Sequence, residues 1–490
     1  MSDYKYGAYG EIAESVNRAT TNGATAPIYV GTAPVHTTVG GAERVNVPIL
    51  VRNFAEAVEK LGYSDDWENY TLCEAMYFHF TEAGQAPVIM INVFDPAKHV
   101  ADNATGTVSV TPKDGRATIA SAENIELDSI KIENKTLGTD YTVAYSYQTK
   151  VITIVGTSST SLGTEALNVT YDIVDATKVT KTDVIGATDG EGSNTGVYAV
   201  MNVYQALSMI PALLVVPKWS EQKEVHDAMI TVANGVNNHW QMVVYTDIPI
   251  VNTGSTQMTL SGAATWKAQN GYTSEYEKVH FPQFKTRNKT YHLSVIDCAL
   301  TQRADVETEG IPYKTASNTE IDNAQELYFG SSKLYVDDDT LSRKLVAKGI
   351  TTAAFVGGKW VIWGSNMANY TDDSTITTRG QSSDTTRRML IYLCNRFQQE
   401  HTPDVDKPVT RATLSAIAFE EQARLDALVN AGALLYGKVE LISATSITDD
   451  LLNGDFKYRF EITTTPLAKS LTAYISWTDE GYQTFIESET

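Results

Sequence analysis

Short apolar runs alternate with stretches of helical spacing in the first part of the chain. Ile28–Val30 and Val88–Phe94 are continuous apolar runs, the pattern of strands that are buried on both faces of a sheet. Between them a helical repeat begins after Asn53, a favoured helix-start residue, and ends at Gly62, a favoured helix-end residue. A second helical repeat leads to Gly84. This alternation of strand and helix predicts an α/β core.

The alternation stops after residue 101 and resumes near residue 182. Four further elements are expected beyond that point, namely a helix at 196–209, a strand at 213–216, a helix at 221–233 and a strand at 242–245. In the intervening segment apolar residues recur instead at every second position, in the runs Tyr141–Tyr147, Val151–Ile154 and Val169–Ile173. Such runs, separated by Thr, Ser, Gly and Asp, predict a small β-sandwich or barrel inserted into a loop of the α/β domain.

Both ends of the chain carry apolar and aromatic residues at alternating positions, as a strand does. At the amino end these residues are Tyr4, Tyr6 and Tyr9, and at the carboxyl end they are Leu471, Ala473, Ile475, Trp477, Tyr482 and Phe485. Chain ends are normally frayed, so apolar alternating ends indicate that each needs the edge of a partner sheet.

Length and charge narrow the possible classes of function. A chain of 490 residues is too long for a single core and implies two to four domains. The formal net charge of −21, with no cluster of Lys and Arg, argues against nucleic acid as a partner.

The three cysteines lie far apart in apolar stretches, which favours buried thiols in a reducing cytoplasm. We find no signal-peptide pattern and no membrane-length apolar run, and therefore expect no direct membrane insertion.

Residues that could carry chemistry are sparse. The eight histidines are isolated, and no metal-ligand spacing or nucleophile motif is present. Gly190–Gly196 precedes a predicted helix and could bind an anion, but its acidic neighbours would repel phosphate, so a flexible junction is the preferred interpretation. Acidic turns explain Asp337–Asp339 and Asp372–Asp373 better than a cation site does, and His79 and His99 are interpreted as structural. The sequence therefore predicts no cofactor, no metal and no catalytic site.

Five short segments occur along the chain in a characteristic order. Near the carboxyl end these are a short Trp-containing strand at Gly358–Gly364, an Arg-Arg helix segment at Thr385–Tyr392 and a Gly-Ala-Leu turn at Gly432–Gly437. Upstream, Thr71–Asp95 reads as helix, turn and strand, and Ile210–Pro217 reads as a strand followed by a helix. In this order the segments resemble contractile-tail sheath proteins, and the resemblance covers most of the chain outside the insert.

The resemblance implies a structural subunit of a contractile tail in a phage, a tailocin or another contractile injection particle. Such subunits polymerise on themselves as hexameric rings stacked helically around a tail tube protein, and they contract to drive that tube through a bacterial envelope. Baseplate and tail terminator proteins are the partners implied at the ends of the sheath. The protein is then expected in the host bacterial cytoplasm during assembly and in the virion tail or an extracellular particle afterwards.

Pattern and resemblance together predict an α/β (α+β) multidomain protein with an α/β core, an inserted β domain, a C-terminal mixed α/β assembly domain and strand-exchanging terminal arms. The expected parts are an N-terminal arm at 1–25, an α/β domain at 26–101 and 182–285, an inserted domain at 102–181, an assembly domain at 286–470 and a C-terminal arm at 471–490. The resemblance implies that the arms bind neighbouring subunits by strand addition.

A helical repeat at 411–430 has two open interpretations. Its apolar face, expected in the core, consists of Leu414, Ile417, Leu425 and Leu428. Its charged face, expected to be exposed, carries Arg411, Glu420, Glu421 and Arg424. The charged face is either a solvated surface or, as the resemblance implies, the contact with the tail tube.

Two other classes of protein stay open on the sequence alone. One is an α/β enzyme, such as a hydrolase, with a β-sandwich binding module. The other is a static tail or baseplate component of a virion. The enzyme would need a nucleophile and a base that no motif identifies, and the static component would form rings without tubes.

Overall fold

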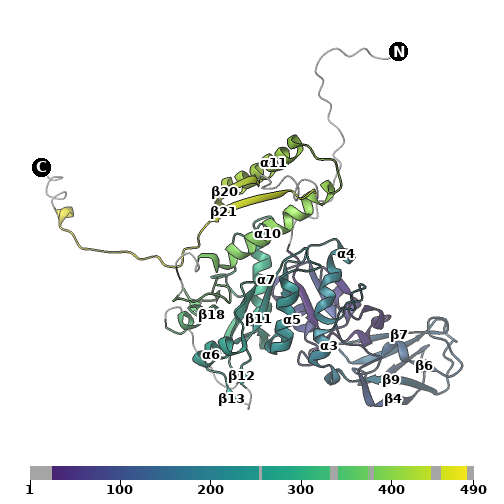
Figure 1. Cartoon of the computed structure of the whole chain (residues 1–490). Coiled ribbons are helices and arrows are strands. Elements are labelled where there is room, and N and C mark those ends of the chain that lie inside the picture. The colour runs from purple at the N-terminus through teal and green to yellow at the C-terminus, as the bar shows by residue number, and fades with distance from the viewer. Residues whose placement is uncertain are drawn as a thin grey trace, which may run out of the picture. The chain divides into compact units, whose positions relative to one another are not determined.

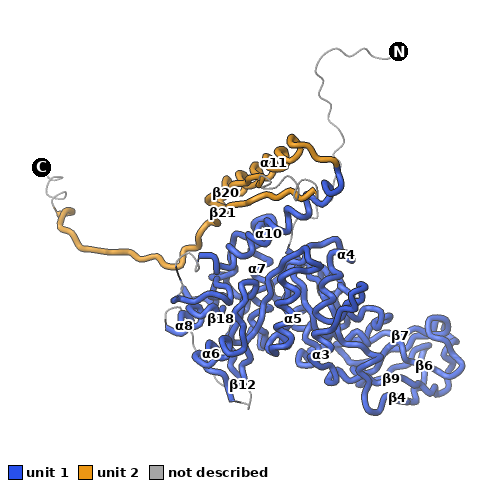
Figure 2. The backbone as a smooth tube through the Cα atoms, viewed as in Figure 1, with its two compact units in different colours: residues 1–407 blue, residues 408–490 orange. Residues whose placement is uncertain are grey.

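The computed structural model describes residues 25–252, 256–330, 340–373, 375, 380–442 and 454–482. The chain divides into two compact units, residues 1–407 and residues 408–490 (Figure 2). Helices and several separate sheets occur together in this structure (Figure 1), which confirms the predicted mixed α/β, multidomain class.

The first unit is built on an eight-stranded sheet with the strand order β19-β18-β14-β11-β10-β1-β3-β2. Its strands are β1 Ile28–Gly31, β2 Pro48–Val51, β3 Val88–Asn92, β10 Leu213–Val215, β11 Val243–Asp247, β14 Glu277–His280, β18 Ile350–Val356 and β19 Lys359–Trp363. The inner strands are parallel, and the two edge strands, β2 and β19, are antiparallel to their neighbours. Strands β1, β3, β10 and β11 are fully buried, as their continuous apolar runs predict.

Nine described α-helices belong to this unit. They are α1 Phe54–Leu61, α2 Leu72–Tyr77, α3 Lys181–Ile185, α4 Val203–Leu207, α5 Lys223–Ala233, α6 Leu260–Asn270, α7 Leu293–Val306, α8 Ser342–Val346 and α10 Asp384–His401. The start and end predicted for α1 are confirmed, because the Asn53 side chain accepts the N–H of Glu56 and Gly62 has a φ of +74°. The helix predicted at 196–209 is instead a 3-10 helix, η6 Gly196–Asn202, followed by α4.

Shorter helical turns complete the unit. They are the 3-10 turns η1 Val35–Thr37, η2 Gly41–Arg44, η4 Leu127–Ser129, η5 Ala176–Lys178, η7 Trp219–Glu221 and η8 Thr402–Asp404, and the π-helical η3 Phe78–Ala83, which continues α2 as far as Gly84.

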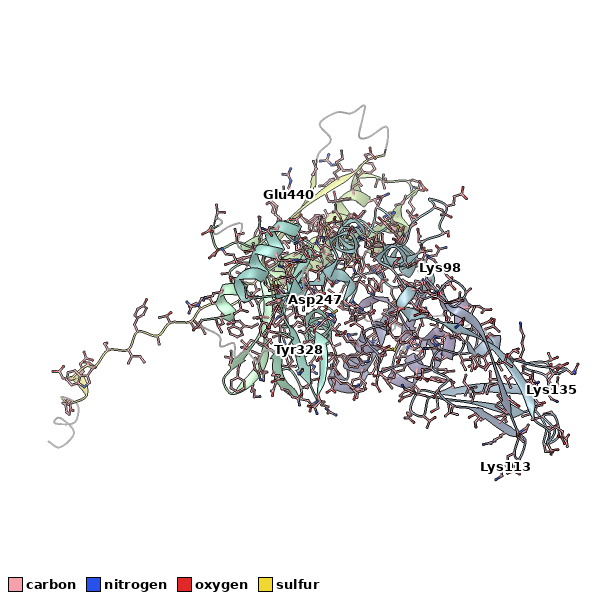
Figure 3. The ribbon with its side chains drawn as sticks, turned by 90° about the horizontal axis from the view of Figure 1, so that it is seen from below. Lys98, Lys113, Lys135, Asp247, Tyr328 and Glu440 are labelled. Carbon is pink, nitrogen blue, oxygen red and sulfur yellow. The ribbon has the colours of Figure 1, made fainter. Side chains whose placement is uncertain are left out.

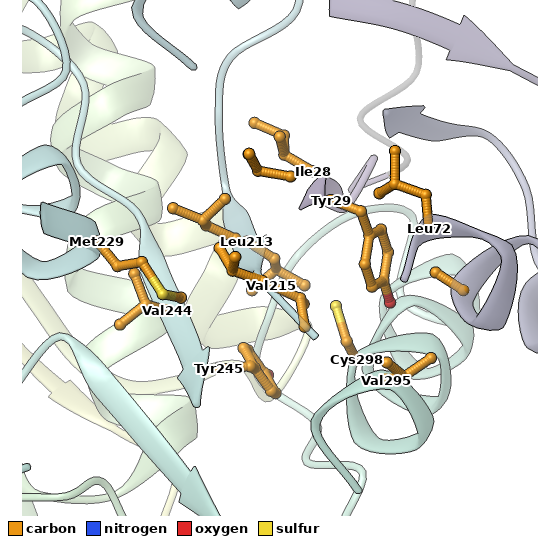
Figure 4. Close-up of a cluster of buried hydrophobic side chains, with 14 of the residues drawn as sticks. Ile28, Tyr29, Leu72, Leu213, Val215, Met229, Val244, Tyr245, Val295 and Cys298 are labelled. Carbon is orange, nitrogen blue, oxygen red and sulfur yellow. The ribbon is translucent and has the colours of Figure 1, made fainter. Parts of the chain in front are cut away.

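Helices cover both faces of the main sheet. In β11 the consecutive side chains Val244 and Tyr245 point to opposite faces. Figure 4 shows Met229 of α5 beside Val244, and Cys298 of α7 beside Tyr29 of β1. The hydroxyls of Tyr245 and of Thr301 in α7 lie 3.1 Å apart. Helices α5 and α7 therefore pack on opposite faces of the sheet.

Two small sheets lie outside the main sheet. Strands β15 Gln283–Thr286, β16 Lys289–His292 and β17 Ala324–Tyr328 form one of them, and β12 Val251–Asn252 and β13 Thr256–Gln257 form a short hairpin. Strands β18 and β19 fall within the predicted 286–470 assembly domain, yet they extend the main sheet beside β14. The boundary predicted at 285–286 therefore runs through one continuous sheet.

The insert contains two three-stranded sheets, ordered β4-β9-β6 and β5-β8-β7. Its strands are β4 Val100–Val110, β5 Arg116–Ile119, β6 Lys131–Ile132, β7 Tyr141–Ser146, β8 Val151–Gly156 and β9 Leu167–Val174. Side chains from both sheets, among them Ile152, Ile154 and Val169, form a hydrophobic core separate from that of the main sheet. Figure 3 labels Lys113 and Lys135 on this insert.

The insert is joined to the main domain at a stem made by its two connecting segments. Lys98, before the insert, forms an ion pair with Asp183, after it, and Lys178 lies 2.7 Å from Asp102. Burial by itself raises the pKa of Asp183, but the hydrogen bonds from Lys98 and from the Thr180 N–H outweigh burial and lower the pKa from 3.8 to about 2. The carboxylate form of Asp183 therefore stabilises the stem.

We expect the stem to lose this stabilisation as the pH falls. The pKa of Asp183 is lowered on folding, so its contribution is complete above its ordinary pKa and disappears as the pH drops through about 2. Asp183→Asn should lower the free energy of unfolding by about 1 kcal/mol at pH 7. Urea unfolding at a series of pH values should show the difference from wild type shrinking below pH 4. The matched change at the exposed Asp102, Asp102→Asn, should have a smaller effect, and a pH-independent difference for Asp183→Asn would contradict this account.

The second unit contains one long helix and a two-stranded antiparallel sheet, here called the ribbon. The helix is α11 Arg411–Asn430, and the ribbon consists of β20 Leu434–Ile442 and β21 Lys457–Thr464. Helix α11 packs along β20, and Thr410 caps its start by accepting the N–H of Thr413.

Candidate assembly surface

The segment after β21 is apolar, extended and exposed. Residues 465–478 form neither helix nor strand. The side chains of Leu471, Ile475 and Trp477 are 90, 94 and 79 % exposed, and Tyr482 is exposed as well. The strand predicted here is therefore absent from the single chain, since a strand requires a partner edge and no described strand pairs with these residues. The other predicted arm residues, Tyr4, Tyr6, Tyr9 and Phe485, lie outside the described residues.

The ribbon has two chemically different faces. Toward α11, the half-buried side chains are Val439, Leu441, Tyr458, Phe460 and Ile462. On the other face exposed charges alternate, because Lys438 is paired in register with Glu461, and Glu440 with Arg459. Lys438 and Glu440 also form an ion pair, which raises the pKa of Lys438 and lowers that of Glu440.

Helix α11 has the predicted bounds but not the predicted division of its faces. Leu425 and Leu428 are buried as expected, whereas Leu414 and Ile417 are only half-buried. The expectation that Glu421 is exposed is wrong, because Glu421 is 5 % exposed. The helical repeat places it on the same side as Leu425 and Leu428, so the packing face is wider than four apolar residues.

The charged residues of α11 are largely engaged with one another. Arg424 forms an ion pair with Glu421, and its other guanidinium nitrogen lies 2.7 Å from Glu420. Arg424 is consequently half-buried, while Arg411 and Glu420 are exposed. Phe419 is 75 % exposed, although the sequence analysis does not name it as a candidate surface residue. Its position outside the predicted apolar face of the helix is the signal that indicates this exposure.

Helix α11 approaches β20 closely at one point. A Cβ atom added to Gly437 would lie 2.9 Å from Cβ of Leu425, so only glycine fits there without a shift. Beside this contact Gln422 Nε2 donates to the Gly437 carbonyl at 3.0 Å, and Gln422 Oε1 accepts the Val439 N–H at 2.9 Å. Gln422 Nε2 also donates to Asp426 at 2.9 Å. Helix and strand are thus joined by packing and by hydrogen bonds from the Gln422 side chain to the main chain of β20.

Buried charged side chains join β14, α7 and α10 in the first unit. Lys278 Nζ lies 2.7 Å from Asp297 Oδ2 and 3.1 Å from Asp384 Oδ2, and His280 Nε2 lies 2.8 Å from Asp297 Oδ2. Burial acts to lower the pKa of Lys278, but the charges of Asp297 and Asp384 outweigh burial and raise the pKa above its usual value. Lys278 therefore remains a cation inside the core.

The Arg-Arg pair of the sequence motif has two separate roles in α10. Arg388 is buried and forms an ion pair with Asp305 in the last turn of α7. Thr25 Oγ1 donates to the same Asp305 carboxylate at 2.5 Å. Arg387 lies near the surface and pairs with Glu275. Arg387 therefore makes an ion pair near the surface of the unit, and Arg388 stabilises its core.

A second polar cluster lies near the carboxyl ends of the parallel strands, where α/β enzymes place their sites. Ser294 Oγ donates to Asp247 at 2.5 Å, and both residues are buried. His292 Nδ1 lies 2.9 Å from Glu74 and its Nε2 lies 3.6 Å from Glu221. Burial acts to lower the pKa of His292, but the charge of Glu74 raises it well above the usual value. These contacts pair buried charges and hydroxyls, and they account for the cluster as part of the core.

Where the structure describes them, the acidic runs and the histidine that the sequence offered as candidate metal-binding residues have hydrogen-bond or ion-pair partners. Asp337–Asp339 lie outside the described residues, and Asp372 forms an ion pair with Lys348 at 2.9 Å. His79 Nε2 and the Tyr29 hydroxyl lie 2.7 Å apart. Among the described residues, no group of three or more His, Cys, Asp or Glu side chains is arranged to hold a metal ion.

The glycine-rich loop at 190–196 is closed by its own backbone. Asp189 Oδ1 accepts the N–H groups of Glu191 and Ser193 at 2.8 and 3.0 Å, and these hydrogen bonds lower the pKa of Asp189. Of the three cysteines, Cys73 and Cys298 are buried as expected, but Cys394 is exposed on α10. No helix in the described part of the chain combines the length and the apolar character needed to cross a membrane.

Comparison with known proteins gives one relative in sequence and several in structure. The chain is 24 % identical over 474 residues to a tail sheath protein of Burkholderia phage BcepMu, covering 94 % of this chain and 92 % of the relative. No family model matches the chain.

The fold is similar to that of solved contractile-system proteins. A chain of the anti-feeding prophage baseplate aligns with a TM-score of 0.55 and 13 % identity, covering 97 % of this chain and 99 % of that one. A chain of the contracted sheath complex of PVC, an extracellular contractile injection system, aligns with a TM-score of 0.52 and 11 % identity, covering 98 and 99 %. The sheath tail protein of Desulfitobacterium hafniense aligns with a TM-score of 0.50 and 9 % identity, covering 94 and 100 %.

Proposed function

We propose that this chain is a contractile tail sheath subunit and that it polymerises as hexameric rings stacked helically around a tail tube. The sheath shortens and drives the tube through a bacterial envelope. Similarity over nearly the whole length to a phage tail sheath protein supports the first part of this proposal. The protein is a contractile tail sheath subunit, with a structural role, that belongs to a virion tail or an extracellular contractile particle.

The exposed C-terminal segment is the observation that carries the mode of assembly. Along this extended segment, apolar side chains (Leu471, Ala473, Ile475 and Trp477) alternate with Thr472, Tyr474 and Ser476, and no described strand pairs with it. A segment with this pattern can add to a sheet with its apolar side chains on the covered face. The ribbon offers such a face, since its half-buried side chains lie toward α11. The segment of one copy would therefore bind the second unit of another.

The remaining partners follow from that arrangement. A sheath of identical copies ends at a baseplate and at a tail terminator, which are the proposed partners beyond the tail tube. Assembly takes place in the host bacterial cytoplasm, before the particle is released. Contraction draws on the relaxation of a metastable lattice, in which the copies move as rigid bodies while their terminal arms act as hinges.

Electron microscopy of the purified protein tests the proposal directly. We expect tubes with a helical repeat, and hollow tubes of larger diameter after mild destabilisation as the lattice relaxes. Rings that never stack would favour a static tail or baseplate component. A monomer that stays unassembled at high concentration would contradict the proposal.

We propose further that α11 faces the tail tube, and that its exposed charged residues contribute to the contact. Arg411 and Glu420 are exposed and remain candidates. Arg424 and Glu421 are engaged in an ion pair within the helix, so they contribute less than the sequence implied. A contact that must release during contraction is favoured by charges of this kind, because exposed ion pairs are worth about 0–1 kcal/mol each.

Arg411→Glu is expected to weaken co-assembly of sheath and tube. Reversal of one exposed charge should cost up to about 1 kcal/mol, or roughly fivefold in affinity, with a larger effect at low salt. The helix should stay folded, because an acidic residue at a helix start is favourable. Co-sedimentation of the variant with preformed tubes measures the effect. Lys314→Glu, an exposed charge reversal in the first unit, serves as the control. If Arg411→Glu prevents sheath self-assembly while leaving tube binding intact, the tube contact lies elsewhere.

A further inference from the structure

The edges of a two-stranded ribbon are open to unwanted pairing. An edge strand presents N–H and C=O groups that can pair with a strand of any other copy. A protein that assembles by strand addition must therefore keep some edges closed while it uses others. In this chain the edge of β20 that points away from β21 meets the side chain of Gln422 on α11.

The Gln422 side chain occupies the positions that a neighbouring strand would use. Its Nε2 donates to the carbonyl of Gly437 and its Oε1 accepts the N–H of Val439. Residues at i and i+2 of a strand direct their main-chain groups to the same side. The side-chain amide of glutamine has the same donor and acceptor as a peptide group, so it can satisfy both main-chain groups together.

Two further contacts hold Gln422 in place. Nε2 also donates to Asp426 Oδ1 at 2.9 Å, one helical turn farther along α11. The close approach of Leu425 to Gly437 fixes the distance between helix and strand at this point. Leu425 is 1 % exposed, so this contact is part of the packed interior of the unit. The amide is therefore held against β20 by packing as well as by hydrogen bonds.

We propose that Gln422 closes the β20 edge of the ribbon against an extended strand from a second copy of this chain. A strand such as Leu471–Trp477 cannot pair at Gly437 and Val439 while the Gln422 amide is bound there. Strand addition is thereby directed away from β20, and each copy accepts its neighbour in a single arrangement. The purpose of this closure rests on the proposed function, but the closure itself is a property of the single chain.

Gln422→Met in the full-length chain tests this proposal. Methionine keeps the length of the side chain and its preference for helix, and it removes both hydrogen bonds to β20. Loss of the Gln422 acceptor should speed exchange of the Val439 amide hydrogen about fivefold, as expected for one lost hydrogen bond. Sedimentation velocity should also show self-association of the variant at concentrations where the wild type is monomeric. Gln398→Met, which removes a similar bond from α10 to the His239 carbonyl, should change neither measurement.

Unchanged exchange at Val439 would overturn the proposal, as would faster exchange with wild-type sedimentation. If Gln422→Met does not fold, as judged by circular dichroism, Gln422→Glu replaces it. That variant keeps an oxygen for the Val439 N–H and loses the donor to Gly437, so a smaller gain in self-association is expected. A wild-type chain that never forms tubes would contradict the proposed function, whereas self-association of Gln422→Met would still support closure of the edge.

Discussion

Removal of residues 472–490 is expected to leave a folded protein that forms no tubes. The deleted segment carries exposed apolar side chains, Ile475 and Trp477 among them, that the single chain does not bury. The cut lies beyond Thr465, whose N–H and hydroxyl bind the Ala433 and Gly432 carbonyls and complete the second unit. The variant should therefore keep the circular dichroism of the wild type and sediment as a monomer. Tubes of normal length from this truncation would refute assembly through the C-terminal arm.

A substitution experiment separates the alternating pattern from the mere presence of the arm. Ile475→Ser together with Trp477→Ser should weaken assembly strongly, because both side chains belong to the apolar set that would lie on the covered face of the shared sheet. Thr472→Ser together with Tyr474→Ser changes the opposite set and should have a smaller effect. Comparable losses from both pairs would mean that the arm does not add as a strand.

Deletion of residues 1–20, the N-terminal arm, is likewise expected to prevent tube formation.

Elements whose sequence pattern is local were predicted well. Helix α1 has both its signals in adjacent residues, with Asn53 at its start and Gly62 at its end. The buried strands β3 and β10 show the continuous apolar runs that a position between two layers requires. Helix α11 was placed with its observed bounds. In each case the sequence signal lies within the element or one residue beyond it.

Helix α7 was missed because its surroundings hide the usual pattern. It is buried on nearly all sides, so it has no polar face to set off an apolar one. Its buried polar residues, including Asp297 and Asp305, are acceptable only because Lys278 and Arg388 from other elements pair with them. No local window of sequence contains both members of these pairs. The pairing of β18 with β14 was not predicted either, because these two strands lie far apart in the sequence.

The exposure of single residues on α11 also depends on partners that the sequence does not place. The sequence predicts that Glu421 is exposed, but it is buried on the same side of the helix as Leu425 and Leu428 and forms an ion pair with Arg424. Gln422 gave no signal at all, because its importance comes from the backbone of β20, about fifteen residues later in the chain. The absence of a side chain at Gly437 was visible, yet its reason is the approach of Leu425.

Lys278→Met is expected to destabilise the first unit by about 3–5 kcal/mol, because it leaves buried carboxylates without their cation. Lys278 is 1 % exposed and contacts both Asp297 and Asp384. Burial raises the pKa of Asp297, but the charge of Lys278 outweighs burial and keeps the pKa below its usual value. Denaturant unfolding followed by tryptophan fluorescence measures the loss. Lys314→Met, which removes an exposed ion pair with Glu307, should cost less than about 1 kcal/mol.

The pH dependence of Lys278→Met gives a signature that a simple packing defect would not produce. Without Lys278, the pKa of Asp297 should rise in the folded protein, so the folded state binds a proton that the unfolded state releases at neutral pH. The destabilisation caused by Lys278→Met should therefore shrink as the pH is lowered from 7 toward 5. Lys278→Met combined with Asp297→Asn and Asp384→Asn should recover part of the loss at pH 7, because no unpaired buried charge remains. A loss that is the same at both pH values, and that the added substitutions do not reduce, would indicate that Lys278 acts only through its packing.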